Sequence, residues 1–177
     1  MSSNFSAEIK RHGKNSFIKL FFTNPLFRFI IIFRINQNIK KYNPFFILLR
    51  IWLKNIKVKY NIQIPTHTKI GEGFLLNHYG GIVINQNVII GKNCNVSQGV
   101  TLGNVSRGKL KGCPTIGDRV WIGANAVVVG KITIGNDVLI APLSYVNFDV
   151  PDSAVVSGNP AKIVNYNGSS IYIKNIN

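Results

Sequence analysis

Acidic residues are scarce in this sequence. Its 177 residues contain six Asp and Glu against 21 Lys and Arg, and the formal net charge is +15. The excess lies mainly in residues 1–60, where 12 basic residues and one Glu give 12 − 1 = +11, whereas residues 61–177 carry 9 − 5 = +4. The charge is compatible with nucleic acid, an anionic membrane or an anionic substrate, and alone it does not choose among them.

Cysteine and long apolar runs are also lacking. Cys94 and Cys113 do not have the spacing of a metal-ligand pair, and two cysteines give no sign of a disulfide framework. Charged residues and prolines interrupt the apolar stretch 17–53, which excludes a spanning helix of about 18 apolar residues. Residues 1–16 are polar and show no secretory signal. We therefore expect an uncleaved chain in a reducing cytoplasm.

Apolar residues make up 46% of the sequence, which is enough for one domain with a core. Beyond Tyr60 they leave the helical period and recur every six residues. A fixed repeat of this length is typical of a parallel β-helix, in which three units form a triangular coil of about 18 residues. Fourteen aliphatic residues share the spacing, with phase shifts between three runs: Ile64, Ile70, Leu76, Ile82, Ile84, Ile90, Val96, Leu102, Ile116, Ile122, Val128, Ile134, Ile140 and Val146.

These aliphatic side chains are expected to point inward and fill the prism, so we assign them no catalytic role. Glycine often follows them, as in Ile70-Gly71, and permits the positive φ angles that a corner needs. The alternative fold, an antiparallel sandwich, would show a period of two with turns about every 8 to 12 residues.

The six-residue phase breaks between Leu102 and Ile116, which are 14 positions apart rather than six or twelve. The stretch near 104–113 is polar, basic and rich in glycine, and it predicts an exposed loop that leaves the prism. Such a loop is either functional or a solvated spacer.

Two helices are predicted before the repeats, over 25–42 and 44–60, each with proline in its first turn. Their apolar residues are too many for one stripe. They could pack on the prism or on neighbouring subunits, or lie with their Lys and Arg on an anionic membrane at the inner face of the plasma membrane. No base-stacking or groove-binding motif is recognisable, so nucleic acid is not expected.

The repeat region carries four motifs in a fixed order: His78-Tyr79-Gly80-Gly81-Ile82-Val83-Ile84, Gln98-Gly99-Val100-Thr101-Leu102-Gly103, Ile122-Gly123-Ala124-Asn125-Ala126 and Gly158-Asn159-Pro160-Ala161-Lys162. On these motifs, residues 61–164 resemble the serine acetyltransferase branch of the hexapeptide-repeat acyltransferases and the surface-polysaccharide O-acetyltransferases similar to it. The resemblance implies a mainly β fold, a left-handed parallel β-helix, over these residues; we expect an N-terminal α-helical segment at 1–60 before it and a tail at 165–177 after it. The resemblance also implies a homotrimer with acetyl-CoA in the groove between neighbouring prisms.

His78 stands where these enzymes have their general base. A neutral imidazole can take a proton from an alcohol as the alcohol attacks a thioester. The alternative is a packed or corner histidine without a catalytic role. His67 has no motif and is expected to be structural or to face the substrate, and His12 receives no role. Only His67 and His78 lie in the repeat region, so a zinc site like that of carbonic anhydrases built on this prism is not expected, and we predict no metal.

The sequence departs from serine acetyltransferases where those enzymes bind serine. Their aspartate fifteen residues before the base corresponds to Gln63, the aspartate just before the base to Asn77, and the Arg-His pair after the loop to Gly112-Cys113. We expect these residues to orient His78 or to line the acceptor pocket, with Cys113 in its wall rather than as a nucleophile.

The expected function is O-acetyl transfer from acetyl-CoA, the co-substrate, to a hydroxyl of a capsular or other surface polysaccharide or its precursor. The alternatives are a serine or other small-molecule O-acetyltransferase and a non-catalytic trimeric scaffold. The resemblance implies five cofactor-binding residues, with Lys162 near a CoA phosphate as a point charge: Gly103, Gly123, Ala124, Ala141 and Lys162. One coil departs from the family pattern, because it reads Ile140-Ala141-Pro142-Leu143-Ser144.

Overall fold

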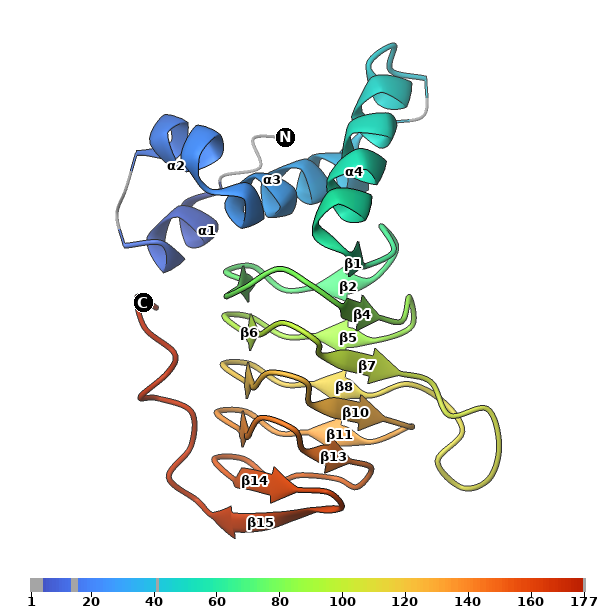
Figure 1. Ribbon diagram of the computed structural model, residues 1–177, viewed down its shortest axis with the longest axis vertical. Helices are drawn as coiled ribbons and strands as arrows, with labels where there is room; N and C mark the ends of the chain where they lie inside the picture. Colours follow the sequence, from blue (N-terminus) through green and yellow to red (C-terminus); the bar gives the residue numbers. More distant parts are fainter. Residues whose placement is uncertain (1–4, 14–15, 41, 177) are drawn as a thin grey trace.

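The computed structural model describes residues 5–13, 16–40 and 42–176, and its main body is a three-sided prism of short strands (Figure 1). Successive strands pass from face A to face B to face C, and strands within a face pair in parallel, apart from the last pair. Face A contains β1 (Ile62–Gln63), β4 (Ile82–Ile84), β7 (Thr101–Gly103), β10 (Val127–Val129) and β13 (Tyr145–Val146). Face B contains β2 (Lys69–Ile70), β5 (Ile89–Ile90), β8 (Thr115–Ile116) and β11 (Thr133–Ile134). Face C contains β3 (Leu75–Leu76), β6 (Asn95–Val96), β9 (Trp121–Ile122), β12 (Leu139–Ile140), β14 (Val155–Gly158) and β15 (Ala161–Asn165).

The strand register gives the length of each coil. Val127 lies opposite Tyr145, which is 18 residues further on, as predicted for three hexapeptide units. Thr101 lies opposite Val127, 26 residues further on, so this coil contains 26 − 18 = 8 additional residues, which form the exposed loop. The exposed loop therefore lies near residues 104–113, where the sequence predicted it.

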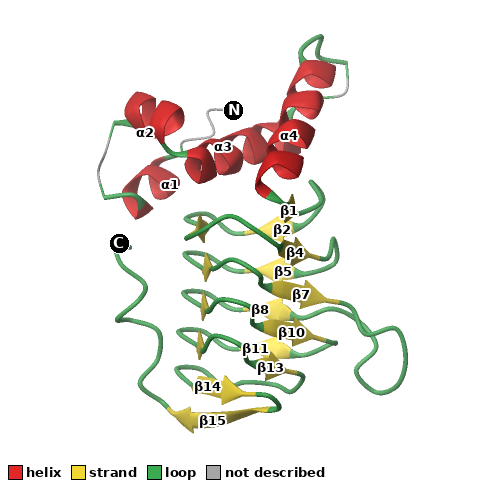
Figure 2. Cartoon of the chain, viewed as in Figure 1, coloured by secondary structure: helices red, strands yellow, loops and turns green. Residues whose placement is uncertain are grey.

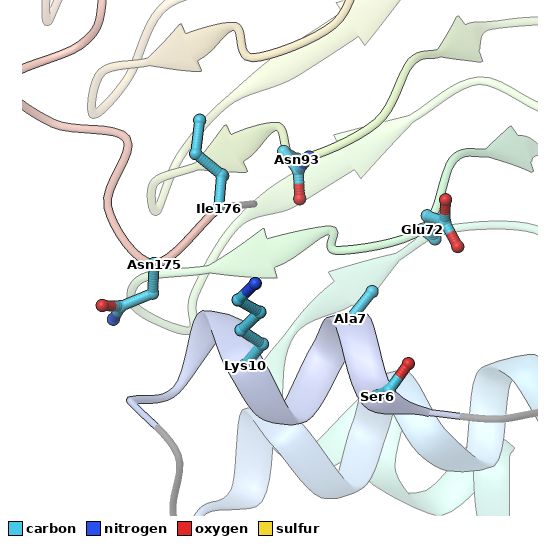
Figure 3. Close-up of a pocket in the computed structure, with 7 residues that line it drawn as sticks. All are labelled: Ser6, Ala7, Lys10, Glu72, Asn93, Asn175 and Ile176. Atoms are coloured by element: carbon cyan, nitrogen blue, oxygen red, sulfur yellow. The ribbon is translucent and has the colours of Figure 1, made fainter.

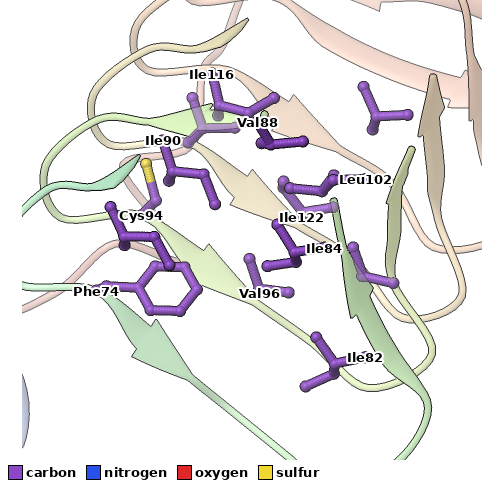
Figure 4. Close-up of a cluster of buried hydrophobic side chains, with 14 of the residues drawn as sticks. Phe74, Ile82, Ile84, Val88, Ile90, Cys94, Val96, Leu102, Ile116 and Ile122 are labelled. Carbon is purple, nitrogen blue, oxygen red and sulfur yellow. The ribbon is translucent and has the colours of Figure 1, made fainter. Parts of the chain in front are cut away.

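The interior of the prism is a continuous stack of mainly aliphatic side chains, which also contains Phe74 and Cys94 (Figure 4). All fourteen residues of the predicted six-residue register are buried, because every second side chain of each short strand points inward. Burying one Ile, Leu or Val contributes about 1.5 to 3 kcal/mol, so the ladder is the main source of stability. The predicted left-handed β-helix with an N-terminal helical segment is confirmed.

Four helices precede the prism in the described part of the chain: α1 (Ser6–Arg11), α2 (Phe17–Thr23), α3 (Pro25–Asn38) and α4 (Phe46–Tyr60) (Figure 2). The predicted helices over 25–42 and 44–60 correspond to α3 and α4, but both predictions were too long. Helix α3 ends at Asn38 because the backbone of Ile39 is extended. The residues between α3 and α4 form the connection that lets the two helices pack against each other. Helix α3 begins as predicted, with Pro25 in its first turn and the Asn24 side chain accepting hydrogen bonds from Leu26 and Phe27.

The helices cover the end of the prism next to the first coil (Figure 1). Apolar residues of α3 and α4, such as Phe33 and Ile56, belong to the same buried cluster as the ladder. Arg34 donates hydrogen bonds to the Ile70 and Gly71 carbonyls, and Gln37 Nε2 donates to the Thr66 and Thr68 carbonyls at 3.1 and 2.9 Å. An exposed strand edge can pair with other chains, and this layer covers it.

The chain then returns along the prism. After β15, residues 166–176 run from the far end of the prism back towards the helices (Figure 1). The Tyr172 ring stacks on Trp121 at 4.5 Å between centroids, and Ser169 Oγ donates to the Arg119 carbonyl at 2.5 Å. The guanidinium of Arg11 in α1, itself buried, bonds to the Gly73 and Lys174 carbonyls and to Asn95 Oδ1. The two ends of the described chain are thus tied together.

None of the helices among the described residues has the length and apolarity required to cross a membrane. Much of the apolar surface of α3 packs inward, while α4 leaves side chains such as Ile47 and Leu48 exposed.

Candidate active site

His78 lies on a corner that is longer than the corners stacked below it. Leu76 pairs with Val96, and Val83 pairs with Thr101, so residues 77–82 in one coil match residues 97–100 in the next. Six residues therefore occupy a corner where four suffice, an insertion of 6 − 4 = 2. We call residues 77–82 the His78 corner; it connects faces C and A. His78 is exposed on it, where an incoming substrate can reach the imidazole.

Two glycines accommodate this insertion. Gly80 and Gly81 have φ angles of 114° and 66°, a region that costs other residues about 1 to 2 kcal/mol. Gly80 also accepts a hydrogen bond at 2.8 Å from the Gly99 amide of the next coil. The chain can therefore bulge at His78 without losing its pairing on either side.

The structure does not show the predicted amides orienting His78. In the described chain the His78 ring has no hydrogen-bond partner. Asn77 is half-buried beside it, and Gln63 is exposed on β1, in face A. The neighbouring Tyr79 ring packs against Tyr60 of α4 at 5.0 Å, which joins this corner to the helical layer.

Gln98 is a further candidate residue that the sequence analysis did not single out. Hydrogen bonds from Asn77 to the Val96 carbonyl and from Gly99 to the Gly80 carbonyl place Gln98 one coil below His78 and Tyr79. Its Oε1 atom is buried and has no hydrogen-bond partner within the described residues. Native proteins rarely leave a buried acceptor unpaired. The sequence could have pointed to Gln98 through its place in the Gln98-Gly99 motif. The lack of a hydrogen-bond partner for its Oε1 atom is visible only in the structure.

A cavity of about 480 Å³ opens between the His78 corner and the helical layer. Its walls come from the corner, from the end of β3 and from α2 and the start of α3. They contain one Lys and no acidic residue: Lys19, Leu20, Thr23, Asn24, Pro25, Leu26, Leu76, Asn77 and Tyr79. The size suits a small molecule.

Most of the predicted cofactor-binding residues continue down the same edge of the prism. Gly123 and Ala124 lie on the third corner between faces C and A, and Ala141 lies on the fourth. Lys162 is exposed opposite Ser157, at the end of this edge. Four coil steps of about 4.8 Å make the line about 19 Å long. A Cβ atom at Gly123 would come within 2.5 Å of Pro142 N, so glycine permits the close approach of two coils.

The other predicted residues lie on the opposite edge of face A. We call this the loop edge; it contains Gly103, the loop 104–112 and Cys113, between faces A and B. The Cys113 sulfur lies 3.8 Å from Asn104 Oδ1, and burial raises the pKa of its thiol. A protonated thiol is a poor nucleophile, which agrees with a role in a pocket wall. Within one chain, face A separates Cys113 from His78.

Two other features lie away from the His78 corner. His67 is exposed between faces A and B. The described residues contain no group of three His, Cys, Asp or Glu side chains able to hold a metal ion. A cavity of about 330 Å³ where α1 meets the C-terminal segment contains none of the predicted site residues (Figure 3).

Comparison with known proteins agrees with this geometry. Residues 113–147 match the family model of the bacterial transferase hexapeptide, six repeats. A serine acetyltransferase from Bacillus subtilis is 38% identical over 127 residues, which are 72% of this chain and 58% of the relative. The chain spans between 30% and 60% of the length of the curated serine acetyltransferases that it matches.

Solved structures extend the likeness to the helices. Serine acetyltransferase from Neisseria gonorrhoeae in complex with serine has a TM-score of 0.72 at 32% identity, covering 91% of this chain and 66% of that one. Serine acetyltransferase from Brucella abortus in complex with coenzyme A has a TM-score of 0.76 at 26% identity, covering 93% and 66%.

The repeat, the prism and its corner histidine define a left-handed β-helix protein of the hexapeptide-repeat class. Its expected resemblance to the serine acetyltransferase branch of the hexapeptide-repeat acyltransferases is confirmed.

The expected capsular-polysaccharide acceptor is wrong. The relatives and the solved structures are consistently serine acetyltransferases, whose name specifies a small hydroxyl compound. The departures from the serine-binding residues favoured a sugar hydroxyl over an amino acid, but they do not exclude a small acceptor, and a cavity of small-molecule size adjoins Asn77. The comparisons also lend no support to the alternative in which residues 1–60 contact a membrane.

Proposed function

We propose that this chain forms the catalytic part of an acetyl-CoA-dependent O-acetyltransferase that acetylates a small hydroxyl compound, with His78 as the general base. One observation carries the proposal: an exposed histidine stands at the head of a prism edge in a fold whose solved relatives include complexes with serine and with coenzyme A. Gly123, Ala124 and Ala141 line that edge, and Lys162 ends it.

The proposed reaction is a direct transfer. The neutral His78 imidazole accepts the acceptor's hydroxyl proton while the hydroxyl oxygen attacks the acetyl carbonyl carbon of the thioester. The tetrahedral intermediate collapses, the carbon–sulfur bond breaks, and the imidazolium returns the proton to the CoA thiolate. General-base catalysis of this kind contributes about 10²- to 10⁴-fold. No acetyl-enzyme is needed, in agreement with the protonated thiol of Cys113.

The experiment follows the release of free CoA and the mass of the acetylated product with acetyl-CoA and a panel of small hydroxyl compounds that includes L-serine. His78→Ala is expected to lower kcat about 10²-fold or more while CoA binding persists. His67→Ala is the comparison variant: it removes the other exposed histidine of the prism, on the opposite edge of face A, and is expected to lower kcat much less than His78→Ala does. Equal activity of the wild type and His78→Ala would reject the assigned base, and failure to bind CoA would favour the non-catalytic scaffold.

We also infer that the protein is a homotrimer. The candidate residues lie on two opposite edges of face A, with His78, Gly123 and Ala141 on one and Gly103 and Cys113 on the other. Threefold symmetry places one edge of each prism against the other edge of its neighbour, which would assemble both groups in each groove. Light scattering is expected to give about three times the 19.7 kDa of one chain. A monomer with full activity would contradict a shared site.

A further inference from the structure

The six carboxylates of this chain are all placed away from the His78 corner. Four lie on the corners between faces B and C, one lies between faces A and B, and one lies on α1: Glu72, Asp118, Asp137, Asp152, Asp149 and Glu8. Most are engaged there. Glu72 binds Lys92 at 2.9 Å, Asp137 binds Arg119 at 2.6 Å, and Asp152 accepts from the Asn136 amide at 2.7 Å. The edge that carries His78 has no negative charge of its own.

Apart from the hydroxyls of Thr23 and Tyr79, the polar side chains around the corner are amides and cations. Asn77 and Lys19 line the cavity, and the buried Oε1 of Gln98 lies one coil below. Beyond Tyr79, the ring of Tyr60 has Lys59 Nζ 5.6 Å from its centroid. An amide oxygen accepts hydrogen bonds from a hydroxyl, but it does not neutralise an ammonium group.

A second copy of the chain adds little negative charge near the His78 corner. In a trimer that brings the loop edge of a neighbour to the His78 corner, the neighbour's corresponding edge contributes Asp149. One oxygen of Asp149 already accepts a hydrogen bond from the Thr133 amide at 2.7 Å. The loop on the same edge adds Arg107, Lys109 and Lys111, all exposed.

We propose, on the basis of the proposed function, that the acceptor is a small hydroxyl compound that carries a carboxylate or phosphate and no ammonium group. Removing an ammonium group from water without a counterion is costly, and here Lys19 and the loop cations would add repulsion. The same cations attract an anion. For a zwitterion such as serine, these cations would strengthen binding of the carboxylate and weaken binding of the ammonium group. For a hydroxy acid they would only strengthen binding.

Five acceptors separate these groups one at a time. L-glycerate replaces the ammonium group of L-serine by a hydroxyl; glycerol and glycerol 3-phosphate carry no ammonium group; and serinol carries an ammonium group without a carboxylate. We expect kcat/KM for glycerate or glycerol 3-phosphate to exceed that for serine and serinol about 10-fold or more. A higher kcat/KM for serine than for glycerate would overturn the inference and leave the proposed function intact. No acetyl transfer to any of the five and no His78-dependent release of CoA would overturn both.

Two sets of variants test the cause. Asn77→Asp combined with Gln63→Asp restores carboxylates and is expected to shift the serine-to-glycerate ratio of kcat/KM about 10-fold towards serine; an unchanged ratio would overturn the electrostatic argument.

Lys19→Gln is expected to raise KM for glycerate about two- to five-fold, as for an exposed charge, and to leave KM for glycerol unchanged. Lys54→Gln, an exposed lysine of α4 outside the cavity, is the matched control, and Lys19→Arg should restore the wild-type KM.

Discussion

Residues in the His78 corner and one coil below it combine exposure of the base with a local cost in stability. Gly80 and Gly81 occupy positive φ angles, and Gln98 buries an acceptor oxygen that has no partner in the described part of the chain. An unpaired buried acceptor costs about 1 to 3 kcal/mol. Because this cost falls beside the proposed base, we expect these residues to serve the substrate as well as the fold.

Gln98 gives the most direct test of this idea. Gln98→Met keeps a similar volume and removes the unpaired oxygen, so we expect the free energy of unfolding to stay the same or rise by up to about 1 kcal/mol. We expect acetyl transfer to fall about 10-fold, because the acceptor loses a hydrogen-bond partner. Urea denaturation and the rate of CoA release check the two halves. A less stable variant with full activity would show that Gln98 serves the fold alone.

His12 predicts how stability depends on pH. Burial lowers the pKa of His12; its ring packs edge-on against Phe27 at 5.1 Å, and its Nδ1 lies 2.9 Å from the Glu8 carbonyl oxygen. The unfolded chain therefore binds the proton more readily than the folded chain, and stability is lost as the pH falls below the ordinary histidine pKa of about 6.5. From about pH 7.5 to 5.5, the wild type should lose more unfolding free energy than His12→Asn. Equal pH slopes in urea denaturation would contradict this assignment.

Among the elements, the strands were predictable and the outer segments were not. A strand of the prism is defined by a side chain such as Ile122 or Ile140 that recurs at a fixed interval, and this information lies in the local sequence. Helices α1 and α2 are short, and the segment after β15 has no repeat. Tyr172 is held by Trp121, 51 positions away along the chain. Only tertiary contacts specify such placements.

The exposed loop is expected to be dispensable for the fold. Deleting residues 105–112 removes eight residues and restores a coil of 18, the length between Val127 and Tyr145. Because the loop side chains are mostly exposed, we expect the thermal midpoint to change by a few degrees at most. Acetyl transfer should fall about 10-fold or more, because the loop borders the acceptor in the proposed trimer. An active deletion variant would identify the loop as a solvated spacer.

The whole molecule explains why the candidate site was only partly predictable. His78 could be identified by its motif, and so could the line of small residues below it. The sequence does not show that Cys113 and His78 lie at opposite edges of face A, because that separation depends on how the coil closes. Nor does it show the distribution of carboxylates around the prism.

A site divided between neighbouring chains predicts complementation. As homotrimers, His78→Ala and the 105–112 deletion should each retain at most about a tenth of the wild-type activity. When the two chains are refolded together in equal amounts, a quarter of the grooves combine an intact His78 corner with an intact loop edge, so activity should return to about a quarter of the wild-type value. Mixing the folded trimers without refolding is the control. No recovery after refolding together would place both parts of the site in one chain.

The bonds of Arg11 link the fold to the time course of protein synthesis. The guanidinium binds the Lys174 carbonyl, 163 residues further along the chain, and burial lowers its pKa. At about 5 to 20 residues per second, a ribosome needs roughly 8 to 33 s to cover that distance. During that interval the coils can stack one after another as they are synthesised, while the Arg11 guanidinium of α1 lacks its Lys174 partner. These contacts of α1 can therefore form only after residue 174 has been synthesised, later than the stacking of the first coils.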